Sequence, residues 1–286
     1  MRLSAIVVHY RSLDVLPRCL VALAAAGEPD VEIVVVDNNS RDGLAERLAR
    51  DFPAARVISN DENVGYARAV NQGIAATSGE YLLVMNPDCF LEGRAARTLA
   101  QYLDAHPRTG LAGPKLLNPD GSYELSARSF PDHFTFLFNR YSLLTRLFPR
   151  NRWSRRYLLT DWDHASAREV DWVSGACMMV RREVIKAVGA MDEGFFMFNE
   201  DVDWCRRITQ AGWAVACVPE ARAVHEVGAS RRRVDARVIL ERHRGMIRYF
   251  HKHHPTNPLV SFLADTLILA RAGLMLARNA LLPPGR

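Results

Sequence analysis

The first third of the chain alternates between continuous apolar, β-branched runs and amphipathic segments. Residues 3–8 and 31–36 have the composition of strands that are buried on both faces of a parallel sheet. The alternation continues with expected helices at 12–26 (with Ser12 as N-cap), 45–51 and 65–76 and expected strands at 56–59 and 81–85. This order predicts an α/β sheet with right-handed crossovers. Ligands of such sheets bind beyond the carboxyl ends of the strands, so the polar residues there are the first candidates for a site.

Asp37 directly follows the second predicted strand, in the sequence DNNSRDG. A carboxylate at this point is able to accept a hydrogen bond from the imide N–H of a uracil or thymine ring, which an apolar slot would leave unpaired. The neighbouring Asn38, Asn39 and Ser40 suit an Asx turn that closes the strand equally well. Both interpretations of Asp37 stay open.

The stretch NVGYARAVNQG, residues 63–73, holds a second set of candidates. Gly65 permits close approach of the backbone to a ligand, Arg68 is expected in the first turn of the following helix, and Asn71 shares its face by i, i+3 spacing. Arg68 is suited to a phosphate or to an acidic neighbour. No GxGxxG sequence follows the first strand, which argues against a dinucleotide-binding fold.

Asn86-Pro87-Asp88 follows the predicted strand at 81–85. An acid at this strand end is placed to bind a hard divalent cation that bridges to a diphosphate. His225, in the sequence HEVGAS, is the candidate for a second ligand because imidazole suits manganese. The structural alternatives are a turn-forming acid after proline and a half-buried, hydrogen-bonding histidine.

The segment FFMFNEDVDWCRR, residues 195–207, places Glu200, Asp201 and Asp203 behind an apolar run. With Asn199 as N-cap, a helix to about Gln210 has the first two acids in its first turn, where backbone N–H groups and the helix dipole favour ionised carboxylates. An ionised carboxylate beside a pocket is a candidate general base. The alternative is that all three only decorate a helix N-terminus. Asp203 is expected to face away from Asp201 and to orient neighbouring residues.

WVSGACMMVRRE, residues 172–183, is predicted to be a strand that enters a helix. Its small residues around Gly175 leave room for a ligand to pass close by. Trp172 is suited to stacking on a ring of the ligand and equally to packing in the core.

Composition excludes several classes of protein. The five cysteines are scattered singly without a CxxC pair, which excludes a zinc ribbon and predicts buried thiols in a reducing cytoplasm. The opening MRLSAIVVHYRS has too short an apolar run for an export signal and is better explained as the first strand. The net charge of +5 in 286 residues is modest, so the position of the positive charge matters more than its total.

Basic and apolar segments of the second half favour a membrane surface. Residues 130–168 mix arginines with aromatics and suit the phosphate zone of a membrane or a lipid-linked pyrophosphate better than nucleic acid, since the chain has no recognisable nucleic-acid module. A basic cluster at 231–237 precedes a helix to about His251, and HKHH at 251–254 is expected to be a solvated helix end. In a helix over 259–282 the polar residues gather in an arc of roughly 140°, which favours a helix lying in the interface over one that spans it. The alternative is packing on the catalytic domain or on a second subunit.

Seven stretches taken together resemble the inverting glycosyltransferases of family 2, and most closely their bacterial rhamnosyltransferase-like branch. The stretches are IVVHY, VVVDNNS, NVGYARAVNQG, VMNPD, WVSGACMMVRRE, MDEGFFMFNEDVDWCRR with the following AGW, and VHEVGAS. They extend over roughly residues 3–230, and it is their order and combination that make the match specific.

The resemblance implies a GT-A fold with a mixed, mostly parallel sheet, a nucleotide-diphosphate sugar donor and a divalent cation, Mg²⁺ or Mn²⁺. By position, Asp37 resembles the base-contacting acid, Asp88 the remaining acid of the DxD metal motif, and Asp201 the catalytic base, whereas His225 resembles a histidine that assists metal or diphosphate binding. Asn86 stands where the family's motif has its first acid, so strict dependence on metal is in question. The candidate donor-binding residues are Asp37, Asn39, Asn63, Gly65, Arg68, Asn71, Asn86 and Asp88, and the candidate acceptor-binding residues are Trp172, Gly175 and Glu200.

The resulting expectation is transfer of a sugar with inversion, with L-rhamnose from its dTDP-activated form as the first candidate, to a glycan or lipid-linked glycan acceptor of cell-surface polysaccharide assembly. The alternatives are another donor, such as a UDP-hexose or UDP-galactofuranose, and a non-catalytic nucleotide-sugar-binding subunit. A catalytic domain at 1–233 with an acceptor-side insertion at 130–168, and a helical extension at 234–286, are expected. The expected location is the cytoplasmic face of the inner membrane, with no nucleic-acid partner and an oligomeric state that the sequence leaves open.

Overall fold

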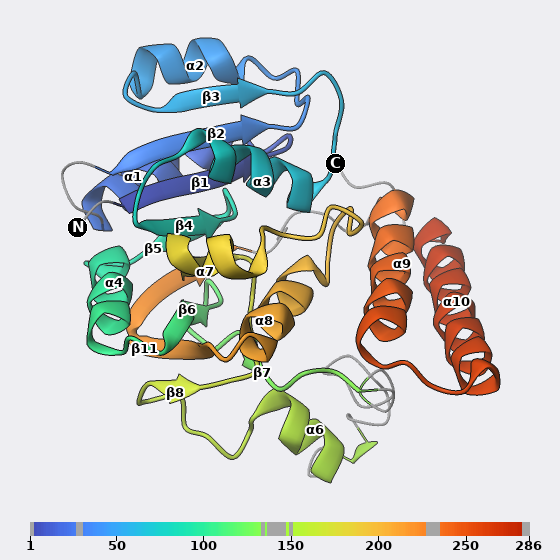
Figure 1. The fold of residues 1–286 in the computed structure, drawn as a ribbon. Coiled ribbons are helices and arrows are strands. Elements are labelled where there is room, and N and C mark those ends of the chain that lie inside the picture. The colour runs from blue at the N-terminus through green and yellow to red at the C-terminus, as the bar shows by residue number, and fades with distance from the viewer. Residues whose placement is uncertain are drawn as a thin grey trace.

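A mixed β-sheet forms the centre of the molecule in the computed structural model, which describes residues 3–26, 31–132, 135, 147–148, 151–226 and 235–281 (Figure 1). Within these residues the strand order is β3-β2-β1-β4-β10-β6-β11-β5, with β8 paired to β11. The strands are β1 (Leu3–His9), β2 (Glu32–Asp37), β3 (Arg56–Ser59), β4 (Tyr81–Met85), β5 (Cys89–Leu91), β6 (Thr109–Leu117), β8 (Arg168–Glu169), β10 (Cys177–Arg181) and β11 (Ala214–His225). A separate pair, β7 (Ala127–Arg128) and β9 (Trp172–Val173), lies off this sheet. The predicted sheet and its N-terminal strands are confirmed.

The parallel half of the sheet brings the predicted strand ends to one edge. β1 pairs with β2 and β4 in parallel, and the register sets His9 opposite Asp37 and Val7 opposite Met85. Asp37 and Asn86, the residue after β4, therefore lie along the same edge of the sheet.

The antiparallel half of the sheet adds the histidine to this edge. β11 runs antiparallel to β5, and their register sets His225 opposite Cys89. Because Asp88 immediately precedes Cys89, the pairing of these two strands alone brings the two residues proposed as metal ligands together.

Helices cover both faces of the sheet, as strands buried on both sides require. Alternate residues of β1 point to opposite faces, so Leu3, Ala5 and Val7 pack with α1 and α4, whereas Ile6 and Val8 pack with α3, α7 and α8. These helices are α1 (Leu16–Ala26), α2 (Leu44–Asp51), α3 (Tyr66–Ala76), α4 (Ala95–Ala105), α6 (Arg152–Leu158), α7 (Arg182–Val188) and α8 (Glu200–Gln210). All five cysteines are buried and free, as expected.

Two predicted helix starts differ from the structure. Ser12 does not cap α1 directly: the helix begins at Leu16, after a turn in which the Ser12 carbonyl accepts the N–H groups of Val15 and Leu16. Asn199 occupies the N-cap position of α8, but its φ of 69° is left-handed and its side chain makes no capping hydrogen bond. The first turn of α8 is therefore held by contacts other than the predicted cap.

A helical hairpin of α9 (Ala236–His253) and α10 (Pro258–Ala280) stands beside the sheet, with α10 packed along α9 (Figure 1). α10 has the length and apolar composition of a membrane span, yet little of it is buried in the protein. Its polar residues Asp265 and Asn279 face the protein: Asp265 pairs with His251 of α9 at 2.8 Å and Asn279 is buried. The large apolar residues on its outer side are exposed, namely Leu259, Val260, Phe262, Leu263, Leu267, Leu269 and Leu274.

Some predicted segments lie partly or wholly outside the described residues. Most of 130–150 within the expected insertion, and Arg231, Arg232 and Arg233 of the basic cluster, belong to this part. The described remainder of the insertion contains α6 and β8.

Candidate active site

A cavity of about 400 Å³ lies where the strand ends, the first turn of α8 and the α9–α10 hairpin meet. Six of the residues predicted from sequence line it, namely Asn86, Trp172, Gly175, Glu200, Asp201 and His225. Many other residues of the described lining were not predicted from the sequence. They include Tyr66, Glu124, Arg128, Arg242, Tyr249 and Arg271. Residues more than 100 positions apart in the chain are thus brought to one cavity.

Asp201 is held rigidly at the start of α8. Its Oδ2 accepts the backbone N–H of Gly175 at 2.9 Å and its Oδ1 accepts the N–H of Val202 at 2.9 Å. The carbonyl of Gly175 in turn accepts the hydroxyl of Tyr66 at 2.9 Å. A Cβ on Gly175 would lie 3.3 Å from the Cβ of Asp201, so only glycine lets this turn approach the carboxylate without a shift.

Burial raises the pKa of Asp201, although the hydrogen bonds from Gly175 and Val202 and the charge of Arg128 oppose the shift. The backbone N–H groups thus favour the ionised form of Asp201, as predicted, but burial opposes them and its effect is larger. A carboxylate with a raised pKa is a stronger base than an ordinary aspartate and still has donors that stabilise its ionised form.

Glu200, the preceding residue, is in a different environment. It is 6% exposed, and its Oε2 has no hydrogen-bond partner among the described residues. Burial and then the charge of Asp201 raise the pKa of Glu200 well above its ordinary value. Burial thus raises the pKa of both adjacent acids, and two N–H donors make the ionised form better stabilised at Asp201 than at Glu200.

Asp88, His225 and Glu124 form a chain of contacts at the cavity edge. His225 Nε2 lies 3.4 Å from Asp88 Oδ1, and its Nδ1 lies 2.8 Å from Glu124 Oε2. Burial acts to lower the pKa of His225, but the two carboxylates outweigh it and raise that pKa to about 9. Glu124 orients the ring so that Nε2 faces Asp88, the arrangement in which a carboxylate fixes a metal-binding imidazole.

The donor atoms of Asp88 and His225 suit Mn²⁺ or Mg²⁺ in part. A carboxylate oxygen and an imidazole nitrogen side by side are acceptable ligands, with Glu124 as support. Within the described ranges no group of three His, Cys, Asp or Glu side chains is arranged to hold a metal. The remaining coordination positions would have to be filled by water and by oxygens of a bound diphosphate.

Trp172 and Arg128 form one wall of the cavity. Trp172 is 6% exposed and its indole N–H donates to the carbonyl of Ser129 at 2.9 Å. The guanidinium of Arg128 lies 4.9 Å from the Trp172 ring centre and shifts the pKa of Asp201 downwards by its charge. Trp172 is thus a packed residue that also lines the cavity, and its stacking on a sugar ring stays a prediction.

Three predicted donor-binding residues accept hydrogen bonds from near neighbours in the chain. Asp37 Oδ1 accepts the N–H of Ser40 at 2.9 Å, Asn39 Oδ1 accepts Arg41 Nε at 2.9 Å, and Asn63 Oδ1 accepts the N–H of Gly65 at 3.0 Å. Asp37 therefore closes the end of its strand, but through the third residue on rather than the second as in an Asx turn. Asp37 lies on the same sheet edge as Asn86 but outside the described lining of the cavity.

Arg68, Asn71 and Gly65 contact the loop before α8. Arg68 Nε donates to Glu193 at 2.9 Å, and Asn71 donates to Glu193 and to the carbonyl of Met191. At Gly65, where φ is +90°, the closest approach is that of Phe196: a Cβ on the glycine would lie 2.6 Å from the Phe196 carbonyl oxygen. In this structure these three residues hold a loop, and their roles toward a donor stay predictions.

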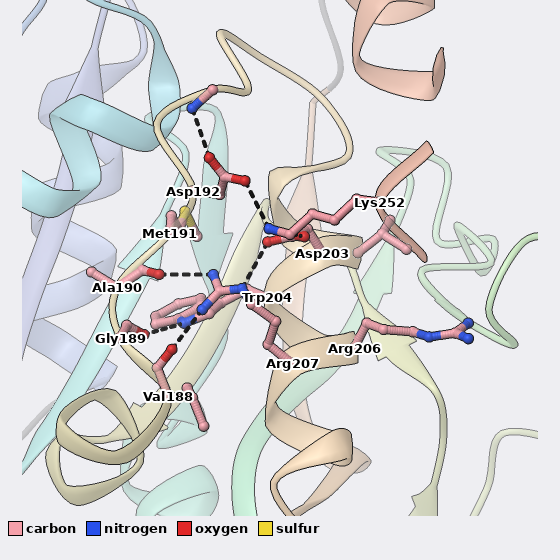
Figure 2. A network of polar contacts seen from close by, with 12 residues as sticks. Val188, Gly189, Ala190, Met191, Asp192, Asp203, Trp204, Arg206, Arg207 and Lys252 are labelled. Atoms are coloured by element: carbon pink, nitrogen blue, oxygen red, sulfur yellow. Dashed lines mark hydrogen bonds and ion pairs between the residues drawn. The ribbon is translucent and has the colours of Figure 1, made fainter. Parts of the chain in front are cut away.

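The carboxylate of Asp203 joins α8 to α9 through a hydrogen bond and an ion pair (Figure 2). Asp203, which is fully buried, accepts hydrogen bonds from Arg207 at 2.9 Å and from His253 of α9 at 2.7 Å, and it pairs with Lys252 at 2.7 Å. Burial acts to raise the pKa of Asp203, but these donors outweigh it and lower that pKa. Asp203 therefore orients neighbours as predicted, whereas His253 is not the solvated helix end that was expected.

The comparisons with known proteins agree with this geometry. Residues 4–189 match the sequence profile described as Glycosyl transferase family 2. The chain is also 32% identical over 263 residues to the N-acetylglucosaminyl-diphospho-decaprenol L-rhamnosyltransferase of Mycobacterium tuberculosis, with 88% of this chain and 85% of that protein covered. The chain belongs to glycosyltransferase family 2. A second relative of this glycosyltransferase is the dTDP-rhamnosyl transferase RfbF of Shigella flexneri, 27% identical over 204 residues, 70% of this chain and 62% of that protein.

Solved structures confirm the predicted fold class. The mannosyltransferase PcManGT from Pyrobaculum calidifontis, in complex with GDP-Man and Mn²⁺, aligns with a TM-score of 0.60 at 18% identity over 99% of this glycosyltransferase and 76% of that chain. GalNAc-T7 with UDP, GalNAc and Mn²⁺ aligns with a TM-score of 0.60 at 16% identity, covering 79% of this chain and 44% of that one. At such identities the likeness shows the GT-A fold alone.

Sequence reasoning missed the residues that face the cavity from irregular or distant segments. Glu124 and Arg128 lie around the short strand β7, and Arg242 and Arg271 lie on helices far along the chain. None belongs to the stretches that resemble the family, and no periodic pattern points to them. Of these four residues only Arg271 could have been suspected from sequence, because it is one of few charged residues in a largely apolar helix.

Proposed function

We propose that this glycosyltransferase transfers L-rhamnose from dTDP-L-rhamnose to a glycan linked through diphosphate to a lipid, with inversion at the anomeric carbon. The names of two relatives support this choice: one is an L-rhamnosyltransferase named for N-acetylglucosaminyl-diphospho-decaprenol, and the other is a dTDP-rhamnosyl transferase. Such a reaction belongs to the assembly of cell-surface polysaccharide.

The observation that carries the proposal is the carboxylate of Asp201, fixed by two backbone N–H groups in a cavity that it shares with His225 and Asn86. Direct displacement needs one base to take the proton of the acceptor hydroxyl as that oxygen attacks the anomeric carbon. The raised pKa of Glu200 favours its neutral form beside Asp201. Rigid placement of the base reduces the entropy cost of reaching the reactive geometry.

Asp88 and His225 would hold the divalent cation and Glu124 would keep the imidazole in place. When bound, the cation neutralises negative charge on the departing nucleoside diphosphate. Asp37 and Asn39 are proposed to contact the base of the nucleotide and Asn63, Gly65, Arg68, Asn71 and Asn86 the remainder of the donor. Trp172, Gly175 and Glu200 are proposed to face the acceptor.

We also propose that α10 rests on the cytoplasmic face of the membrane. Its outer side is largely apolar and exposed, while Asp265 pairs with His251 of α9 and Asn279 is buried. A helix of this kind lies in the interface and brings the enzyme to a lipid-linked acceptor.

A donor and acceptor panel tests the proposal. Purified enzyme is incubated with dTDP-L-rhamnose, UDP-hexoses or UDP-galactofuranose, with N-acetylglucosaminyl-diphospho-decaprenol as acceptor, with and without Mn²⁺, and the product's anomeric configuration is read by NMR. Inverted rhamnosyl product that depends on the cation is expected. Preference for a UDP-sugar would replace the donor assignment, and binding of nucleotide-sugar without turnover would indicate the non-catalytic alternative.

A further inference from the structure

Arg271 is a charged side chain without a counter-charge in the part of the chain that the structure describes. It lies on α10, is half-buried and lines the cavity that contains Asp201. Among the described residues it makes no hydrogen bond or ion pair, and burial lowers its pKa. Burying a guanidinium without a counter-charge is costly, so a side chain in this setting calls for an anionic partner beyond those that the described residues supply.

A second arginine faces the same cavity from the other helix of the hairpin. Arg242 of α9 lines the cavity, and its guanidinium lies 4.4 Å from the ring centre of Phe198 in the loop before α8. Neither of the two lining acids of α8 pairs with Arg271: Asp201 is bound to backbone N–H groups, and burial raises the pKa of Glu200. The hairpin thus brings two guanidinium groups to one side of the cavity.

The surroundings of Arg271 indicate which kind of anion would bind to it. The donor diphosphate belongs with Asp88 and His225, which sit at strand ends rather than on the hairpin. On the hairpin side, Met246 and Phe250 contribute apolar lining, and the outer face of α10 exposes Leu267 and Leu274. An anion that continues into a long apolar chain matches this combination of positive charge and apolar surface.

We propose that Arg271, assisted by Arg242, binds the diphosphate of the lipid-linked acceptor, with the polyprenyl chain leaving the cavity along α10. The inference rests on the proposed function, because it assigns the acceptor side of that same site. It gives α10 a second task beyond membrane contact, since the helix that touches the lipid phase also carries the group that orients the acceptor toward Asp201.

Binding of geranylgeranyl diphosphate tests the subsite without any need for turnover. Dissociation constants are measured by isothermal titration calorimetry, with excess dTDP and no divalent cation, for wild type, Arg271→Gln, Arg271→Lys and the control Arg278→Gln, which removes an exposed charge from the same helix. Loss of a charge-assisted contact worth about 1.5–3 kcal/mol should weaken binding roughly 10-fold to 150-fold in Arg271→Gln. Arg271→Lys should recover part of the loss and Arg278→Gln should bind as wild type.

Steady-state kinetics then distinguish binding of the acceptor diphosphate from binding of the donor. In Arg271→Gln we expect a raised KM for N-acetylglucosaminyl-diphospho-decaprenol, an unchanged KM for an octyl N-acetylglucosaminide, and an unchanged KM for the donor. Unaltered geranylgeranyl diphosphate binding, an equal loss in Arg278→Gln, a raised donor KM, or a selective loss of binding to anionic phospholipid vesicles would each overturn the assignment. If wild type transfers no sugar, the proposed function fails while the calorimetry still decides the subsite.

Discussion

Glu200 and Asp201 are adjacent acids that differ in how well their surroundings stabilise the ionised form. The difference comes from the partners that each side chain finds: two backbone N–H groups for Asp201 and none for Oε2 of Glu200. Sequence places both in the first turn of a helix and gives no means to rank them. Their ranking depends on the Gly175 turn, which is supplied by a segment 26 residues away.

Replacement of Glu200 by Gln should change the pH dependence of stability. An acid whose pKa is raised on folding stabilises the protein below its unfolded pKa, and this contribution is lost as the pH rises through the folded pKa. The unfolded value is near 4.5 and the folded value lies well above it. The difference in Tm, variant minus wild type, should therefore grow from pH 5 to pH 8 in differential scanning fluorimetry. A difference that does not vary with pH would show that Glu200 ionises normally.

Gly65 has a close neighbour that the sequence did not indicate. Its φ is positive, and the carbonyl oxygen of Phe196 lies where a Cβ would have to fit, whereas the close approach of a ligand to this glycine stays a prediction. Gly65→Ala should lower the free energy of unfolding by about 3 kcal/mol, the sum of backbone strain and overlap. Gly121→Ala, which also has a positive φ but open space around it, should cost only about 1 kcal/mol. Equal losses in urea unfolding would contradict the contact with Phe196.

At the scale of elements, α8 is fixed at both of its ends. Its first turn meets the Gly175 turn, while Asp203 and Arg207 tie it to α9 and to the loop after α7. The sequence predicted the helix and its bounds closely, because apolar periodicity and Gly212 are local signals. It did not predict the partners of Asp203, because Lys252 and His253 come from a helix about fifty positions later.

Asp203→Asn should destabilise the protein by about 3–5 kcal/mol, because it leaves Arg207, Lys252 and His253 without their buried counter-charge. Glu193→Gln, which alters the exposed pair with Arg68, should cost less than about 1 kcal/mol. Chemical denaturation of both variants measures the difference. A loss for Asp203→Asn no larger than for Glu193→Gln would mean that the network does not hold α8.

At the scale of the whole molecule, the N-terminal sheet can be predicted from the sequence, whereas the position of the C-terminal hairpin cannot. Continuous apolar runs can be satisfied only by burial on both faces, so the strands and their order in the chain were predictable. α10 was predicted as an amphipathic helix, but whether its apolar side turns inward or outward depends on which surface of α9 it meets. The boundary between 233 and 234 stays a prediction.

The exposed apolar side of α10 should bind membranes. Leu263→Glu combined with Leu267→Glu places two charges on this side and should keep the enzyme in the supernatant when anionic phospholipid vesicles are sedimented. Ala45→Glu combined with Ala49→Glu makes the same change in charge at exposed positions of α2 and should leave sedimentation as in wild type. Co-sedimentation of both double variants would rule out α10 as the contact.

The account as a whole depends on Asp201 as the base, and single-turnover transfer by Asp201→Asn tests it most directly. Loss of a positioned general base should slow transfer about 100-fold to 10,000-fold while the dissociation constant of the donor stays near that of wild type. Asp51→Asn, at an exposed acid of α2 outside the cavity, serves as the control and should transfer at the wild-type rate. Transfer by Asp201→Asn at a rate similar to wild type would contradict the account.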